Sequence, residues 1–275
     1  MSLSHSDSYS DRYRVLPGAA LDLDAYDADD RGPYTRKKEA VADLQALREQ
    51  LRALQERFYA WDKRSLLIVL QAMDTGGKDG VIEHVMHGVN PQGVQVTPFK
   101  VPTPEELAHD FLWRVHKAAP ARRMIGIFNR SHYEDVLVVR VRNLVPPDVW
   151  GQRYEQINQF ERLLADTGTV ILKFYLHITK DEQAQRLQAR LDSPDKRWKF
   201  AMGDLAERKL WDDYMAAYTA ALSQCSTAHA PWFVVPANRK WYRNVVIANI
   251  LVETLTQLDP QFPQPEAGLD DVVIV

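Results

Sequence analysis

The segment from Ser65 to Val89 constrains the fold of this chain more than any other part of the sequence. Residues Ser65–Gln71, SLLIVLQ, contain a continuous apolar run from Leu66 to Leu70, which predicts a strand buried on both faces. A tight turn containing Gly76, Gly77 and Lys78 follows, and apolar residues then recur at helical spacing. This order of strand, glycine turn and helix predicts a phosphate-binding loop, where backbone N–H groups and the positive end of the helix dipole face an anion.

The loop departs from the usual pattern G-x-x-x-x-G-K-[ST] at two positions. Ala72 stands in place of the first glycine, and Asp79 in place of the hydroxyl residue that binds magnesium. Asp74 adds a carboxylate inside the loop, which would repel a bare polyanion but can hold a Mg²⁺ ion that bridges phosphate oxygens. We therefore expect a loop for metal-bound phosphate. The alternative is an ordinary strand-to-helix turn with a solvated lysine.

Length and composition narrow the class of protein. A chain of 275 residues that is 45% hydrophobic can form one substantial α/β domain. Its net charge of -3 argues against a nucleic-acid or membrane-surface partner, so any anion site must be a local cluster of cations. Cys225 is the only cysteine, which excludes an intramolecular disulfide and a cysteine-based zinc site. The sequence shows no basic and apolar leader and no apolar run of spanning length, so we expect a soluble, cytoplasmic protein.

Hydrophobic periodicity predicts alternating strands and helices. Residues 1–33 have no clear period and are interpreted as an extended or partly ordered arm, and residues 36–61 form a long amphipathic helix. Further strands are expected at 94–99, 124–128, 170–178 and 232–235, and further helices at 104–116, 154–166, 181–191, 205–222 and 242–258. Strands separated by helices predict a five-stranded parallel sheet covered on both faces, a three-layer α/β/α fold.

A second polar cluster follows the strand at 124–128. Arg130 can clamp a phosphate with two parallel hydrogen bonds, while Glu134 and Asp135 offer the oxygen ligands that magnesium prefers. The carboxyl end of a strand in such a fold is where ligands bind, so these side chains are expected opposite Asp74. The alternative is a charged helix start capped by Ser131 and Glu134, and the two interpretations are compatible.

Cations also gather elsewhere. Lys100, Arg114 and Lys117 could approach the loop from a neighbouring strand edge, or they could be solvated surface charges. Arg186 and Arg190 share one helical face, and three more cations follow within residues 196–199. An arginine-rich segment of this kind can serve as a lid that excludes water and offsets the charge of a transferring phosphoryl group. A solvated basic helix end is the alternative for the lysines.

Three motifs together resemble the family-2 polyphosphate kinases: AMDTGGKD at 72–79, FNRSHYEDVL at 128–137 and RLDSPDKRWK at 190–199. The resemblance runs from about residue 34 to residue 258. It implies a P-loop kinase domain of the thymidylate-kinase-like type over 34–260, with a helical lid at about 184–204 and a tail at 261–275. It also implies transfer of the terminal phosphoryl group of inorganic polyphosphate to a nucleotide, with Mg²⁺ or alternatively Mn²⁺. A homo-oligomer, dimer or tetramer, is expected. The second motif, with Asn129 and Glu134, is similar to that of the class that acts on both AMP and ADP, giving ADP and ATP.

The resemblance also implies roles for individual residues. Lys78, Asp74, Arg130, Asp135 and Arg190 would act in catalysis, and Asp74, Asp135 and Glu134 would hold the metal. Asn129 and Glu134 would contact the nucleotide. Phosphate would be bound by Gly76, Gly77, Lys78, Asp79, Lys100, Arg114, Lys117 and Arg186. Transfer would be in line and without a covalent intermediate.

Two other functions fit the residues taken alone. A conventional ATP-dependent nucleotide or nucleoside kinase needs the same loop, magnesium carboxylates and arginine lid. A nucleotide-binding module without catalysis would bind phosphates but show no turnover, although the retention of Lys78, Asp74, Asp135 and Arg190 argues against it.

Overall fold

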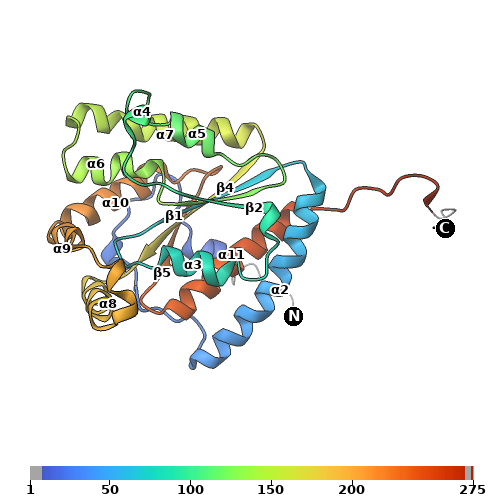
Figure 1. The fold of residues 1–275 in the computed structure, drawn as a ribbon, viewed down its shortest axis with the longest axis horizontal. Helices are drawn as coiled ribbons and strands as arrows, with labels where there is room; N and C mark the ends of the chain where they lie inside the picture. Colours follow the sequence, from blue (N-terminus) through green and yellow to red (C-terminus); the bar gives the residue numbers. More distant parts are fainter. Residues whose placement is uncertain (1–7, 270–273, 275) are drawn as a thin grey trace.

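The computed structural model describes residues 8–269 and 274 and contains a five-stranded sheet with strand order β2-β3-β1-β4-β5 (Figure 1). The strands are β1 Ser65–Gln71, β2 Val94–Pro98, β3 Ile125–Asn129, β4 Thr169–His177 and β5 Trp232–Pro236. All four pairings are parallel, which confirms the predicted fold class. Because β1 is central, its carboxyl end lies between the ends of β3 and β4, and loops from three strands meet there.

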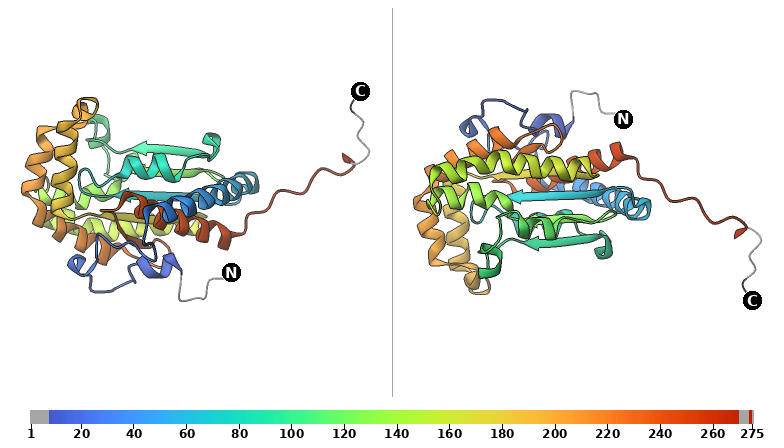
Figure 2. Two further views of the ribbon diagram at one scale, coloured as in Figure 1. Left: turned by 90° about the horizontal axis from the view of Figure 1, so that it is seen from below. Right: turned by 90° about the horizontal axis from the view of Figure 1, so that it is seen from above.

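Helices cover both faces of the sheet, as expected for a parallel sheet (Figures 1 and 2). On one face lie α2 Lys37–Trp61, α3 Lys78–Val85 and α11 Lys240–Leu258. The other face carries α5 Trp113–Ala118, α6 Val138–Val141, α7 Pro147–Asp166 and α10 Trp211–Cys225. Helices α8 Lys180–Asp192 and α9 Met202–Lys209 project beyond the carboxyl edge of the sheet, joined by the short η5 Pro194–Lys199. This pair of helices includes the segment predicted as a lid.

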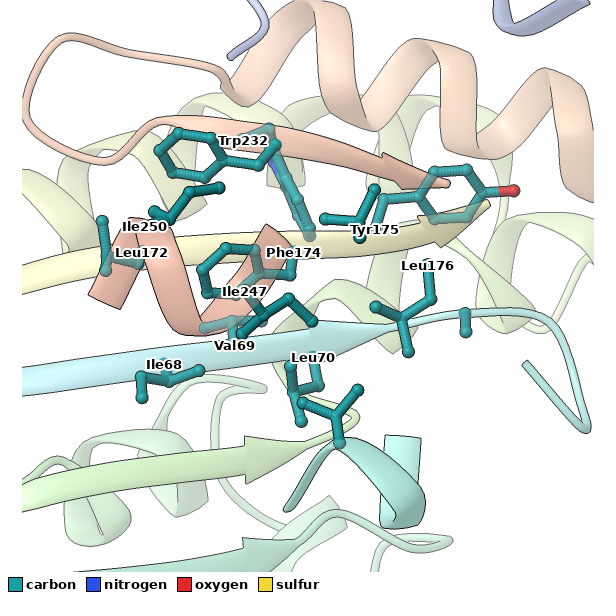
Figure 3. Packing of buried hydrophobic residues seen from close by; sticks show 14 of the residues in the cluster. Ile68, Val69, Leu70, Leu172, Phe174, Tyr175, Leu176, Trp232, Ile247 and Ile250 are labelled. Atoms are coloured by element: carbon teal, nitrogen blue, oxygen red, sulfur yellow. The ribbon is translucent and has the colours of Figure 1, made fainter. Parts of the chain in front are cut away.

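The core that fixes the end of β1 consists of side chains from three strands and α11 (Figure 3). Every residue of β1 is buried, as its continuous apolar run predicts. Leu70 and Phe174 face Ile247 in this core, and the Phe174 and Phe233 rings stack with centroids 5.3 Å apart. Each such aliphatic or aromatic side chain contributes about 1.5–3 kcal/mol on burial. The strand end that leads into the glycine turn is therefore firmly held.

Two segments, each predicted as one helix, contain two helices in the structure. Residues 104–116 form α4 Pro104–Leu107 and α5, because the Asp110 carboxylate accepts the Leu112 N–H at 3.0 Å and makes a turn between them. Residues 205–222 are divided at Leu210 into α9 and α10. Trp211 is buried in the core at the start of α10, whereas α9 projects with α8 beyond the carboxyl edge of the sheet. Tertiary packing overrides helical periodicity in this case.

Residues 8–33 pack against β5 and α11. The short helix α1 Tyr9–Tyr13 is held by Glu253 of α11, whose carboxylate accepts the N–H groups of Tyr9 and Ser10 at 2.9 and 3.0 Å. The N–H of Val15 donates to the carbonyl of Trp232 at 2.9 Å, and Arg14 and Phe233 form an antiparallel bridge. The arm thus covers the outer edge of β5, which would otherwise present unpaired backbone groups.

Candidate active site

The glycine turn after β1 has the geometry of a phosphate-binding loop, here residues 72–77. Gly77 caps α3 with φ +103°, and a Cβ atom at this position would lie 2.0 Å from Nη1 of Arg243. Lys78 begins α3 as the sequence predicts, and its ammonium donates to the carbonyl of Ala72 at 3.2 Å. The Gly76 N–H already donates to the Met73 carbonyl at 2.9 Å, so this amide is committed within the loop. The N–H groups of Gly77, Lys78 and Asp79 have no such backbone acceptor among the described residues, so the expected amide contact to phosphate would rest on them.

The second loop, residues 130–135 after β3, lies beside the first. Arg130 adopts φ +62°, a left-handed conformation that costs a non-glycine residue about 1–3 kcal/mol and is typical of functional sites. Its guanidinium donates to the Asp74 carboxylate at 2.8 Å. Asn129 donates to Asp79 at 2.7 Å. The structure therefore joins the two motifs that the sequence placed at the carboxyl edge.

The adjacent carboxylates Glu134 and Asp135 point to different environments. Burial raises the pKa of Glu134 above its ordinary value. The nearby charges of Arg130 and Lys78 act in the opposite direction but do not cancel this effect. Asp135 instead accepts from Arg153 of α7 at 2.8 Å, and burial raises the Asp135 pKa to about 6. Among the residues that the structure describes, no three His, Cys, Asp or Glu side chains form a metal-binding group. The expected trio of Asp74, Glu134 and Asp135 is thus not gathered.

A sealed ionic network supports the second loop from behind. The Lys173 ammonium of β4 donates to Glu161 of α7, to the Tyr133 hydroxyl at 2.7 Å and to the Cys225 carbonyl at 2.6 Å, while His132 lies 3.1 Å from Glu161. Lys173, Glu161 and His132 are completely buried. Burial opposes ionisation of Glu161, but Lys173 and His132 hold its pKa below the ordinary value. The sequence signal for this network was a lysine within the apolar run VILKFYLH.

A cavity of about 1060 Å³ opens at the carboxyl edge over these loops. Its lining includes nine lysines and arginines: Lys78, Lys100, Arg130, Arg186, Arg190, Lys196, Lys199, Lys240 and Arg243. Five carboxylates line it as well: Asp74, Asp79, Glu83, Glu182 and Asp204. Nine cations against five acids is a local excess of four positive charges, although the whole chain carries -3. The cavity therefore has the local cluster of cations that the sequence analysis requires for an anion site.

Some predicted site residues do not reach this cavity. The Arg114 guanidinium lies over the Phe99 ring at 5.3 Å and donates to the Lys100 carbonyl at 2.9 Å. The Lys117 ammonium lies 4.0 Å from the centroid of the Trp113 ring. Neither side chain lines the cavity, in contrast to Lys100, and Glu134 and Asp135 do not line it either.

Sequence reasoning missed two cations on α11, Lys240 and Arg243. Arg243 is 1% exposed, and its Nη1 has no hydrogen-bond partner among the residues that the structure describes. Burial, with a contribution from Arg186, lowers the pKa of Arg243 to about 9. The available signal was the segment NRKWYRN directly after the last strand, because that position places it at the same carboxyl edge.

Two arginines of the lid helix differ in their surroundings. The Arg190 side chain is 27% exposed, donates to the Lys199 carbonyl at 3.2 Å and lies 3.6 Å from Asp204. Arg186, one turn earlier, is buried and bonded to protein groups. Only Arg190 therefore has donors that can turn toward a ligand without breaking several bonds.

The chemistry of the site suits a phosphate ligand that carries a divalent cation. The Asp74 carboxylate lines the cavity beside Lys78, and the buried Thr75 Oγ1 has no partner within the described part of the chain. Both are hard oxygen donors, and Mg²⁺ commonly takes one or two protein oxygens and completes its shell with phosphate oxygens and water. The residues present therefore fit a metal–phosphate complex.

Comparison with known proteins shows relatives of similar sequence and structure. The family polyphosphate kinase 2 (PPK2) matches residues 34–263. An AMP/ADP-polyphosphate phosphotransferase of Meiothermus ruber is 56% identical over 264 residues, covering 96% of this chain and 99% of the relative. An ADP-polyphosphate phosphotransferase of Rhodopseudomonas palustris is 42% identical, covering 92% of each chain. The crystal structure of polyphosphate kinase 2 from Arthrobacter aurescens TC1 superposes with a TM-score of 0.93 at 44% identity, covering 98% and 96% of the two chains.

Proposed function

Because this chain belongs to the polyphosphate kinase 2 family, we propose that it transfers the terminal phosphoryl group of inorganic polyphosphate to AMP and to ADP. The relative from Meiothermus ruber, whose name carries both acceptors, aligns with nearly the whole chain at 56% identity. The acceptor assignment agrees with the Asn129 and Glu134 version of the second motif.

The observation that carries this proposal is the distribution of cations around the cavity. Beyond the phosphate-binding loop, Lys196 and Lys199 of the lid segment and Lys240 and Arg243 of α11 line the same space. A polyphosphate chain carries charge at every unit, so it requires a row of cations, whereas an ATP donor requires an apolar pocket for its base. We assign the binding of the polyphosphate donor to these four residues in place of Arg114 and Lys117, and we call them the donor track. Lys100, which follows β2, lines the same cavity from the other end of the sheet.

Each remaining group has a role that its position supports. Lys78 and the N–H of Gly77 hold the phosphates next to the bond that breaks. Asn129 and Glu134 are assigned to the acceptor nucleotide, and of these two Asn129 lines the cavity. Arg130 and Arg190 offset the charge of the transferring phosphoryl group. Transfer through a loose in-line transition state needs little covalent assistance, so no protein nucleophile takes part.

Asp74 would hold the divalent cation, with the Thr75 hydroxyl beside it. When bound, Mg²⁺ neutralises phosphate charge at the reacting end of the donor. Asp135 is bonded to Arg153 and would have to exchange that partner in order to join the metal. Asp74 already forms an ion pair with Arg130 at 2.8 Å, which orients its carboxylate at the edge of the cavity.

The test combines purified protein, Mg²⁺, AMP and long-chain polyphosphate without any nucleoside triphosphate, and follows nucleotides by chromatography. ADP followed by ATP is the expected result. ADP alone, with ADP itself inert as an acceptor, would contradict the dual-acceptor proposal. Product formation only when ATP is supplied would indicate a conventional kinase. A Lys78→Met variant purified in parallel controls for contaminating kinases, because it should show no comparable turnover.

We also infer that the protein works in the cytoplasm as a homo-oligomer, a dimer or a tetramer. None of the described helices is long and apolar enough to cross a membrane. Light scattering coupled to size exclusion tests the oligomer, and a mass of one 31.6 kDa chain at micromolar concentration would contradict it.

A further inference from the structure

Arg186 makes an unusual set of contacts for a lid arginine. Its five N–H donors all have protein acceptors. Nε donates to Glu182 at 2.6 Å, and Nη1 donates to the carbonyls of Thr75 and Gly76 at 3.0 and 3.1 Å. Nη2 donates to the carbonyls of Ala237 and Asn238 at 2.6 and 3.0 Å. The guanidinium therefore has no donor left for a phosphate.

A second residue of the same helix extends this grip. Gln183, which is 1% exposed, donates through Nε2 to the carbonyl of Asp74 at 3.1 Å. Together Gln183 and Arg186 hold three consecutive loop carbonyls, those of residues 74, 75 and 76. The first turns of α8 thus form a rigid wall behind the phosphate-binding loop, whereas Arg190 and η5 lie further along, where side chains are exposed.

Holding a carbonyl also fixes the next amide. The peptide group is planar and trans, so its C=O and N–H point in opposite directions. The bond from Arg186 to the Gly76 carbonyl therefore determines the direction of the Gly77 N–H, which donates to no acceptor among the described residues. The bonds to Ala237 and Asn238 anchor this arrangement to the turn between β5 and α11, close to Arg243.

We propose that Arg186 is a positioning residue, which orients the phosphate-binding loop through its carbonyls and does not itself neutralise the transferring phosphoryl group. This inference rests on the proposed phosphate-binding role of the loop. Lysine cannot replace arginine here, because one ammonium with three donors cannot reach five acceptors on three segments. A charge-neutralising arginine, in contrast, would be replaced by lysine with a smaller loss.

Arg186→Lys is the first test, with two measurements that require no turnover. Hydrogen exchange of the backbone amides in residues 74–80 should become about tenfold faster or more, because the loop loses several charge-assisted hydrogen bonds. Calorimetry with magnesium tripolyphosphate should show an affinity about tenfold weaker or more. The melting temperature establishes that the variant is folded.

A matched control separates positioning from general destabilisation. Glu253→Gln weakens the attachment of the arm far from the loop, so it should lower the melting temperature but leave loop exchange and tripolyphosphate affinity within twofold of the wild type. A folded Arg186→Lys protein with wild-type exchange and affinity would overturn the proposal. So would an Arg186→Gln protein that loses affinity with unchanged loop exchange, because that pattern indicates a direct charge contact.

If Arg186→Lys does not fold, Gln183→Leu decides the question. It removes one of the three loop-carbonyl contacts, together with the bond that Arg208 donates to Gln183 Oε1 at 3.1 Å on the side away from the loop, and we expect about threefold faster exchange in the loop with a parallel loss of affinity. Unchanged exchange and affinity in this variant would overturn the proposal. A wild-type protein that binds tripolyphosphate but transfers nothing would contradict the proposed function and leave this inference standing.

Discussion

The two loops at the carboxyl edge of the sheet are each supported by a buried cation, but the supports differ in kind. Arg186 holds the phosphate-binding loop through backbone carbonyls and lies in the wall of the cavity. Lys173 holds the second loop through the Tyr133 hydroxyl and pairs with Glu161 in a network that is completely closed to solvent. One support lines the cavity and the other lies in the core.

This difference separates ligand binding from stability. A change at Arg186 alters backbone groups that we propose bind phosphate, so its effect should appear in affinity. A change at Lys173 leaves the buried Glu161 carboxylate without its lysine partner, so its effect should appear in the free energy of unfolding. Four predictions, in descending order of expected effect, challenge this separation.

Lys173→Met should lower the free energy of unfolding by about 3–5 kcal/mol, because it leaves the Glu161 charge buried without the ammonium that balances it. Urea denaturation measures this, with Lys209→Met as a surface control expected within about 0.5 kcal/mol of the wild type. Adding Glu161→Leu to the variant should restore part of the loss. A hundredfold decrease of kcat in folded Lys173→Met protein would erase the contrast between the two supports.

Lys78→Met should lower kcat about a hundredfold to a thousandfold, equivalent to about 2.7–4 kcal/mol of transition-state stabilisation. Its stability should not fall, since burial already lowers the Lys78 pKa and so disfavours the ammonium. Initial rates and thermal melting test both statements. A variant that loses stability but keeps its rate would place Lys78 with the structural cations instead.

Asp135→Asn should change the pH dependence of stability. The folded-state pKa of Asp135, about 6, lies above its ordinary value, so the folded protein holds this proton more tightly. That contribution is complete below the ordinary pKa of about 4 and is lost as pH rises through 6. Relative to the wild type, the variant should therefore gain about 2–3 kcal/mol between pH 4 and pH 7. Urea denaturation over this range tests the prediction, and a constant difference would contradict it.

Lys196→Ala should raise KM for long-chain polyphosphate about threefold and leave KM for ADP unchanged, because a single exposed charge contributes little. The effect should be larger at low ionic strength. Lys117→Ala is the matched control, since that lysine lies over Trp113 outside the cavity. A larger effect at Lys117 than at Lys196 would return the donor track to the β2 side.

Local sequence was sufficient for the elements whose physics is local. The apolar run at 65–71 and the glycines after it fix a strand, a turn and a helix start within about twenty residues, and the structure has all three. The pairing of Arg130 with Asp74 was also predictable, because parallel strands end at one edge. The helix at 104–116 was not, since its division depends on a single Asp110 turn that periodicity does not reveal.

The sequence by itself therefore determined the parallel sheet, the two loops and the family. Tertiary structure alone decided which cations face the cavity and which are committed to protein groups. Arg186 and Arg190 share one helical face, yet only the first meets the carbonyls of two distant loops. Arg243 reaches the glycine turn because α11 packs against α3. The physical reason is that a charged side chain is defined by the groups that surround it, and those groups come from segments far apart in the chain.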